Sequence, residues 1–238
     1  MKYSISTMVF VCLLSVSVHA GELHTIPGTS LTYYIVNDGQ LPKTAFILFP
    51  GGDGADHVRI EDGKVRLSKN FLVRTANTYA SAGFTTVIVS STTGMSDDYR
   101  QSSEQATHVQ SIINHLAKLG VDKFFLVGTS RGTMSVASLV NKLTDSRIKG
   151  IIMTATVNKV NLRACRVPVL FIHHVDDGCK ASPFQDAKRL SKSHNASFVE
   201  VSGGLPPETD HCKALSPHGF YGVETVATNA MISWARKL

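Results

Sequence analysis

This sequence has few charged residues and no long run of apolar residues. Charged residues make up 18% of its 238 positions, the formal net charge is +6, and no run of Lys and Arg occurs. A basic tract is the electrostatic footprint of nucleic-acid binding, so no nucleic-acid partner is expected. Repeats, low-complexity tracts and linkers are missing as well, so we expect a single folded domain.

The longest apolar stretch stands at the N-terminus and is too short to span a membrane. Residues 8–18 are rich in apolar side chains, Lys2 is the only charge before them, and small residues precede position 21. A bilayer takes about 20 apolar residues, whereas this order of regions is typical of a secretory signal peptide. We expect residues 1–20 to be removed and 21–238 to form an exported protein, periplasmic or secreted, without stable membrane insertion. An uncleaved anchor or a buried helix is the alternative.

Cysteine is scarce too, with four in the sequence. Cys12 lies in the expected signal peptide, which leaves Cys165, Cys179 and Cys212 in an oxidising compartment where disulfides persist. One bridge and one leftover thiol is the simplest outcome. The spacing of these cysteines fits no zinc motif.

Apolar runs alternate with helical patterns along the rest of the chain, which predicts parallel strands joined by right-handed crossovers. We expect strands at 31–36, 44–49, 85–90, 123–127, 148–154, 167–173 and 197–202, and helices at 70–82, 104–119, 130–143, 184–193 and 223–237. Runs such as "TAFILF" are apolar throughout, as a strand covered on both faces must be. The predicted fold is three-layer α/β, a mostly parallel central sheet with helices on both faces, which binds ligands beyond the carboxyl ends of the strands.

Four polar loops fall at those strand ends. They are "FPGGDG" at 49–54, "GTSRG" at 128–132, "HHVDDG" at 173–178 and "SPHGF" at 216–220. A G-x-S-x-G pattern between a strand and a helix is typical of a nucleophile elbow, and the order serine, carboxylate, histidine follows it here. A serine hydroxyl is a poor nucleophile until a base takes its proton, which an imidazole oriented by a carboxylate does near neutral pH.

With these features in this order, the sequence resembles the α/β-hydrolase superfamily, and most of all the compact, lidless members similar to dienelactone hydrolases. The resemblance extends from about residue 31 to the end of the chain. It implies a Ser-His-Asp triad, an oxyanion hole of two backbone N–H groups, and no cofactor. Dienelactone hydrolases carry a cysteine nucleophile where this chain has Ser130, so the resemblance extends to the fold and not to their substrate.

The resemblance also assigns the site residues. Relatives commonly show H-G-x-x-D after the strand at 167–173, and this pattern places the acid at Asp177, with Asp176 capping the turn. His218 is preferred as the base over His211, which lies further from the final helix. The N–H groups of Arg131 and Gly52 are the expected oxyanion donors, and the short segment between 154 and 167 leaves no room for a lid.

Two further groups of residues receive structural interpretations. His173 and His174 are expected to support the fold rather than a metal, because no third ligand has suitable spacing. Arg100, with Asp97 and Asp98, is expected in a solvated loop near the cleft.

Strand length and the triad together predict a disulfide between Cys179 and Cys212, with Cys165 free. A strand of about seven residues keeps Cys165 on the order of 20 Å from Cys179, whereas a disulfide allows about 7 Å between Cα atoms. If Asp177 and His218 touch, the loops that carry Cys179 and Cys212 converge.

The expected function is that of a serine hydrolase that cleaves an ester or a related acyl bond. The same triad serves thioesterases and peptidases, and a non-catalytic binding protein on the same scaffold is the alternative outside the enzymes. An open cleft favours small-molecule esters or polymer ends as substrates. The sequence leaves the oligomeric state open.

Overall fold

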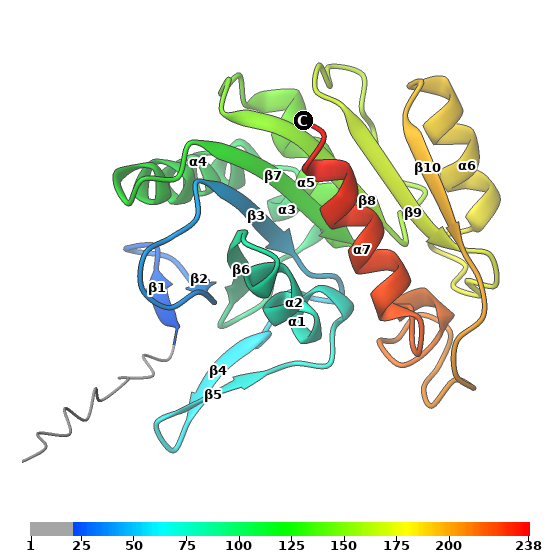
Figure 1. Cartoon of the computed structure of the whole chain (residues 1–238), viewed down its shortest axis with the longest axis horizontal. Coiled ribbons are helices and arrows are strands. Elements are labelled where there is room, and N and C mark those ends of the chain that lie inside the picture. The colour runs from blue at the N-terminus through cyan, green and yellow to red at the C-terminus, as the bar shows by residue number, and fades with distance from the viewer. Residues whose placement is uncertain (1–20) are drawn as a thin grey trace, which may run out of the picture.

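The computed structural model describes residues 21–238, so the expected signal peptide at 1–20 lies outside the described residues. Its main sheet has eight strands in the order β1-β2-β6-β3-β7-β8-β9-β10 (Figure 1). These strands are β1 (Glu22–Thr25), β2 (Leu31–Ile35), β3 (Thr44–Phe49), β6 (Thr85–Ser91), β7 (Lys123–Thr129), β8 (Ile148–Thr154), β9 (Val169–His174) and β10 (Ser197–Val201). The β1–β2 and β2–β6 pairs are antiparallel and the others parallel, which confirms the predicted mostly parallel sheet.

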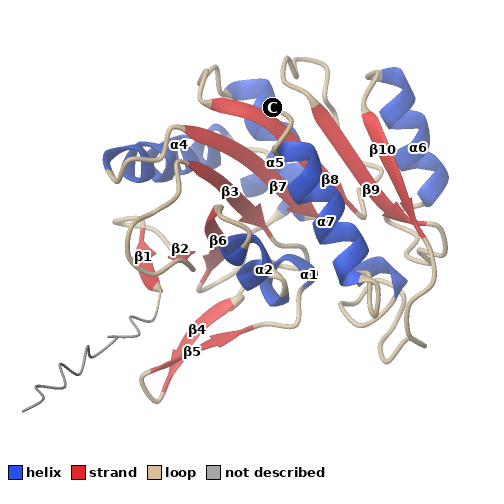
Figure 2. Ribbon diagram, in the orientation of Figure 1, coloured by secondary structure: helices blue, strands red, loops and turns tan. Residues whose placement is uncertain are grey.

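Helices cover both faces of the sheet (Figure 2). They are α1 (Phe71–Arg74), α2 (Ala76–Ser81), α3 (Asp97–Arg100), α4 (Ser103–Lys118), α5 (Gly132–Lys142), α6 (Phe184–Ser193), α7 (Glu224–Ala235) and the 3₁₀ turn η1 (Pro217–Gly219). Buried side chains of α4 and α5 belong to one core, and those of α1, α2 and α7 to the other. The three layers predicted from the sequence are therefore present. No helix within residues 21–238 is long and apolar enough to cross a bilayer.

Strand β3 shows why the sheet needs apolar runs. Ala45 and Ile47 face the core on the α4 and α5 side, while Phe46 and Leu48 face the core beneath α1, α2 and α7. All four side chains are fully buried. Alternate residues of a strand point to opposite faces, so a strand such as β3, covered on both sides, is apolar at successive positions.

A projecting hairpin was not anticipated from the sequence. Strands β4 (Val58–Glu61) and β5 (Lys64–Leu67) pair with each other in a separate two-stranded sheet, which extends away from the domain (Figure 1). Asp62 and Gly63 form its turn, with φ of 51° and 70°. Positive φ at both turn residues is typical of a type I′ hairpin, for which Asp-Gly is a strong sequence signal.

The helix expected at 70–82 is divided in two. Helix α1 ends at Arg74 and α2 begins at Ala76, with Thr75 between them at φ −98° and ψ 1°. The hydroxyl of Thr75 donates a 2.7 Å hydrogen bond back to the carbonyl of Phe71. A side chain that competes for the backbone in this way bends or interrupts a helix.

Candidate active site

Ser130 occupies a strained turn between β7 and α5. Its φ of 52° is in the left-handed region, which is unfavourable for a residue with a side chain. A Cβ at Gly128 would lie 2.7 Å from the carbonyl oxygen of Gly132, and one at Gly132 would lie 1.8 Å from that of Phe49. Glycine is therefore required at both positions because the strand, the turn and the helix approach one another too closely for a side chain. These are the features predicted for a nucleophile elbow.

Asp177 follows β9, and its carboxylate is fully buried. His218 Nδ1 lies 2.9 Å from Oδ2, and His173 Nε2 lies 3.1 Å from the same oxygen. The Ser182 hydroxyl donates to Oδ2 at 3.0 Å, and the backbone N–H of Cys179 donates to Oδ1 at 2.9 Å. The carboxylate thus faces hydrogen-bond donors on both of its oxygens.

These donors stabilise the charged form of Asp177. Burial alone would raise the pKa of the carboxyl group, but hydrogen bonds from His173, His218 and the Cys179 amide outweigh burial and hold the pKa well below its usual range. Asp177 therefore carries a negative charge at neutral pH. A negative charge at this point stabilises an imidazolium at His218.

His218 stands in η1 and is 5% exposed. Its Nδ1 faces the Asp177 carboxylate, so the proton of the neutral ring is held on that nitrogen. Its Nε2 is buried and has no hydrogen-bond partner among residues 21–238. The unshared electron pair on Nε2 is thus available to accept a proton.

The structure brings Asp177 and His218 into contact and places Ser130 at the same edge of the sheet. Strands β7, β8 and β9 are neighbours and run parallel, so the loops after β7 and β9 lie beyond the same ends of the strands. No hydrogen bond joins Ser130 Oγ to His218 within the part of the chain described. Hydrogen bonds of catalytic groups are often long before substrate binds, so the role of Ser130 stays a prediction.

Asp176 and His211, the alternative candidates for the acid and the base, lie in different environments from Asp177 and His218. Asp176 is exposed, and among residues 21–238 its one hydrogen bond runs from its backbone N–H to Nδ1 of His174, at 3.1 Å. The side chain of His211 is exposed and packs over Gly178, where a Cβ would lie 2.7 Å from His211 Nδ1. Neither residue joins the hydrogen bonds around the buried carboxylate. This environment supports the choice of Asp177 and His218.

Two residues at the carboxylate had no catalytic assignment from the sequence. His173 is fully buried, and its Nε2 also faces the carbonyl of Ser182, at 3.0 Å, so this nitrogen carries the proton and donates. Ser182 precedes α6 and was not singled out. No motif marks a serine that reaches a carboxylate five residues away, so only the fold identifies it.

The predicted oxyanion loop packs directly against the nucleophile turn. A Cβ at Gly51 would lie 2.8 Å from Ser130 Cβ and 3.4 Å from Ser130 Oγ. Gly52 follows at φ 66°, and Arg131 precedes the first residue of α5. Within the described chain, the backbone N–H groups of Gly52 and Arg131 donate to no protein acceptor. Both predicted donors are therefore free to bind an oxygen of a substrate.

The expectation of a solvated loop at Arg100 was wrong. Residues 97–100 form α3, and the side chain of Arg100 is fully buried beneath the loop at 50–54. Asp97 instead binds Arg131, with Arg131 Nε 2.9 Å from Asp97 Oδ1. This ion pair holds the Arg131 side chain against α3.

A disulfide joins Cys179 and Cys212, as predicted, with Cα atoms 4.7 Å apart. Cys165 is free, and burial raises the pKa of its thiol. The bond ties the loop that carries Asp177 to the loop that carries His218. Among residues 21–238, no group of three or more His, Cys, Asp and Glu side chains has the arrangement of a metal site.

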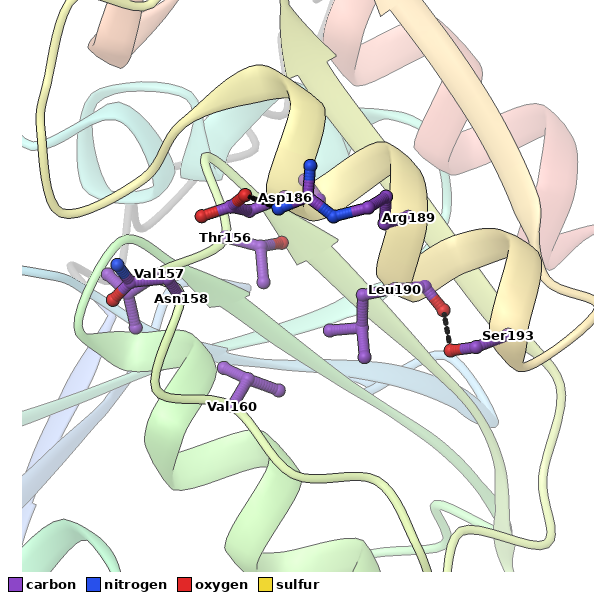
Figure 3. Close-up of a pocket in the computed structure, with 9 residues that line it drawn as sticks. Thr156, Val157, Asn158, Val160, Asp186, Arg189, Leu190 and Ser193 are labelled. Carbon is purple, nitrogen blue, oxygen red and sulfur yellow. Dashed lines mark hydrogen bonds and ion pairs between the residues drawn. The ribbon is translucent and has the colours of Figure 1, made fainter.

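A cavity of about 410 Å³ lies between α6 and the segment that follows β8 (Figure 3). It is lined by Thr156, Val157, Asn158, Val160, Asp186, Ala187, Arg189, Leu190 and Ser193. Asp186 and Arg189 form an ion pair at its margin. None of the three predicted catalytic residues lines this cavity. The segment between β8 and β9 contains no helix or strand that would form a lid.

Solved structures of similar fold include several hydrolases. A serine hydrolase homologue from Coxiella burnetii has a TM-score of 0.63 and 18% identity, over 90% of this chain and 95% of that one. A lidless serine hydrolase from Xanthomonas campestris has a TM-score of 0.59 and 15% identity, over 89% and 94% of the two chains. A thermophilic esterase from Thermogutta terrifontis has a TM-score of 0.59 and 14% identity, over 92% of each.

These likenesses show that the chain has the α/β-hydrolase fold, in its compact form without a lid. No family model and no curated protein matches the sequence. At such low identities the fold carries no assignment of substrate, because one fold serves many chemistries. The function must be argued from the site.

Proposed function

We propose that this protein is an exported serine hydrolase that cleaves an ester or a related acyl bond. The observation that carries the proposal is the pair formed by His218 and the buried Asp177, at the same sheet edge as the strained Ser130. A serine in a glycine-flanked turn is by itself weak evidence for a catalytic nucleophile. A serine, a free imidazole nitrogen and a buried carboxylate at one edge match the roles that acyl transfer requires.

The chemistry follows from the positions of the protons. Ser130 Oγ attacks the acyl carbon while His218 Nε2 accepts the hydroxyl proton. The carbonyl oxygen becomes an oxyanion, held by the N–H groups of Gly52 and Arg131. His218 then protonates the leaving alcohol, and the acyl group remains on Ser130. Water attacks the acyl-enzyme by the same route, which releases the acid and restores the serine.

Asp177 has a defined part in these steps. Its carboxylate keeps the His218 proton on Nδ1 and stabilises the imidazolium that forms. The hydrogen bonds from His173 and Ser182 fix the carboxylate in turn. An esterase and a serine hydrolase homologue are among the solved structures similar to this chain, which supports acyl transfer as the reaction class.

Export is proposed on separate grounds. The N-terminal segment has the order of regions of a signal peptide, and the disulfide is compatible with an oxidising compartment. The proposed substrates are small-molecule esters or the ends of polymers, because no lid covers the site. No cofactor is required by the steps above.

A fluorophosphonate probe tests the proposal, because it reacts covalently only with an activated serine. We expect the wild-type protein to be labelled at Ser130 and the Ser130→Ala variant to remain unlabelled. A panel of p-nitrophenyl esters of increasing acyl length, with matched thioesters and anilides, then separates esterase from thioesterase and peptidase activity. A folded wild-type protein that is neither labelled nor active would favour the non-catalytic binding protein.

A further inference from the structure

Two buried side chains hold three consecutive carbonyl groups of the oxyanion loop. Arg100 Nη1 lies 3.5 Å from the carbonyl oxygen of Pro50, and Nη2 lies 3.4 Å from that of Gly52. His57 Nε2 lies 3.0 Å from the carbonyl oxygen of Gly51, between them. The loop that supplies a predicted oxyanion donor is thus held from its carbonyl side by groups that the proposed mechanism does not use.

The contacts of His57 define which nitrogen carries its proton. Its side chain packs in the interior, with the residue only 7% exposed, and burial lowers its pKa, so the ring is neutral at pH 7. A carbonyl oxygen only accepts, so Nε2 donates to Gly51. Nδ1 then accepts from the Ser68 hydroxyl at 2.8 Å. Ser68 Oγ itself accepts from the backbone N–H of Asn70 at 3.3 Å, which leaves its proton for His57.

Arg100 brings a charge into the interior, and no carboxylate in the described part of the chain bonds to it. The residue is fully buried, and its hydrogen-bond partners among residues 21–238 are the two carbonyl groups and Ser135 Oγ, at 3.3 Å from Nη1, while Nε has none. Burial lowers the pKa of the guanidinium to about 10, so it remains charged at neutral pH. A buried cation is costly unless oxygen atoms surround it, so its position against the loop carbonyls is strongly determined.

Peptide geometry converts these contacts into an orientation of the loop N–H groups. In a planar trans peptide, the C=O and the following N–H point in opposite directions. When His57 holds the Gly51 carbonyl, the Gly52 N–H is directed away from His57. Gly51 itself packs against Ser130, whose Cβ would be 2.8 Å from a Cβ at that glycine.

We propose that His57 and Arg100 are positioning residues, which hold the Pro50–Gly52 peptides so that the Gly52 N–H is fixed for an oxyanion at Ser130. The inference rests on the proposed function for its catalytic consequence. The claim that these two residues hold the loop does not depend on the proposed function. Fixed dipoles stabilise a developing charge because they need no reorganisation during the reaction, so a loosened loop lowers the rate of the chemical step.

Three variants test the proposal. His57→Phe fills the space but removes the donor, His57→Gln retains an N–H donor, and Arg100→Met removes the charge. The matched control is Arg147→Met, which breaks the ion pair with Asp145 at the start of β8, the opposite end of that strand from the site. With p-nitrophenyl acetate, we expect kcat to fall about 10- to 100-fold in His57→Phe and Arg100→Met, with KM nearly unchanged. His57→Gln should recover much of the loss, and Arg147→Met should keep the wild-type kcat.

A second measurement does not depend on catalysis. Two backbone amides report on the oxyanion loop: the Met95 N–H donates to the carbonyl of Asp53 at 2.6 Å, and the Ser91 N–H donates to that of Gly54 at 3.0 Å. Their hydrogen exchange should accelerate at least tenfold in His57→Phe and Arg100→Met, and not in Arg147→Met. Unchanged exchange in both variants would overturn the proposal, whether or not the protein is a hydrolase. Faster exchange with an unchanged kcat would overturn its catalytic part while the proposed function stands. If wild-type protein is neither labelled by fluorophosphonate nor active, the proposed function fails, and the exchange result alone decides whether these residues hold the loop.

Discussion

Asp177 Oδ2 and His218 Nδ1 lie 2.9 Å apart, although 41 residues separate them in the sequence. The two residues are on different loops, one after β9 and one before α7. Contact between them therefore depends on tertiary structure and not on their proximity in the sequence. Such a contact between a buried carboxylate and an imidazole has consequences for rate and for stability that can be measured separately.

The first consequence concerns the identity of the acid. In Asp177→Asn we expect kcat to fall by about 10⁴-fold, because an amide does not hold His218 in the productive tautomer or stabilise its charged form. Asp176→Asn, which changes an exposed neighbour, should alter kcat less than about threefold. Steady-state rates for both variants decide the point. A larger loss in the Asp176 variant would move the acid by one residue.

The two candidate bases are compared in the same way. His218→Ala should lower kcat by at least about 10³-fold, since no other group takes the Ser130 proton. His211→Ala removes an exposed imidazole and should leave kcat near the wild-type value. Circular dichroism of both variants checks that they are folded. The opposite order of activities would show that His211 is the base.

Much of this arrangement was predictable because it follows local rules. Apolar strands alternating with helices predict the parallel sheet, and the crossover rule places the loops after β7 and β9 at one edge. Cys179 and Cys212 were predictable as a pair because one lies close in sequence to Asp177 and the other to His218, two residues expected to touch. Even the β4–β5 hairpin had a signal, in the Asp62-Gly63 turn between two alternating segments.

What could not be predicted are contacts that depend on packing. Nothing in the sequence distinguishes Arg100, fully buried, from the exposed arginines of the surface. His57 and Ser182 belong to no motif, and their partners are backbone carbonyls or a carboxylate that only the folded chain brings near. The pattern of apolar and polar residues shows where a strand or helix lies and which of its sides is buried. It does not show whether a single polar side chain is buried.

Asp177 should also make stability depend on pH. Its pKa is lower in the folded protein than in the unfolded chain, where an aspartate has a pKa of about 3.9. The stabilisation is therefore complete above that unfolded pKa and is lost as the pH falls toward the folded pKa. In urea titrations, the difference in unfolding free energy between wild type and Asp177→Asn should shrink as the pH falls from 5 to below 4. A difference that does not change with pH would contradict the effect of the hydrogen bonds on Asp177.

Gly132→Ala tests the close approach at the elbow. The new Cβ would lie 1.8 Å from the carbonyl oxygen of Phe49, a backbone atom of β3 that has no room to move. We expect a loss of about 3 kcal/mol or more in unfolding free energy, or no folded protein at all. Gly63→Ala is the control, since it has a positive φ of 70° but no neighbouring atom within 4 Å. It should cost only about 1–2 kcal/mol, which separates crowding from backbone strain.

The disulfide provides the last prediction, because it joins the acid loop to the base loop. Cys179 lies two residues after Asp177 and donates its backbone N–H to that carboxylate at 2.9 Å. On the chain-entropy model, a bond between residues 33 apart stabilises the fold by about 3–4 kcal/mol. We therefore expect Cys212→Ser, and wild type treated with dithiothreitol, to unfold at lower urea concentration.

The same changes should lower kcat at temperatures where the protein stays folded, because the Asp177 loop is no longer tied to the His218 loop. Cys165→Ser is the matched control, since Cys165 is free, and both stability and kcat should stay near wild type. Peptide mapping without reductant should recover a linked Cys179–Cys212 peptide from protein prepared under oxidising conditions. Two free thiols at these positions, or a bridge that includes Cys165, would remove the proposed link between oxidation and the geometry of Asp177 and His218.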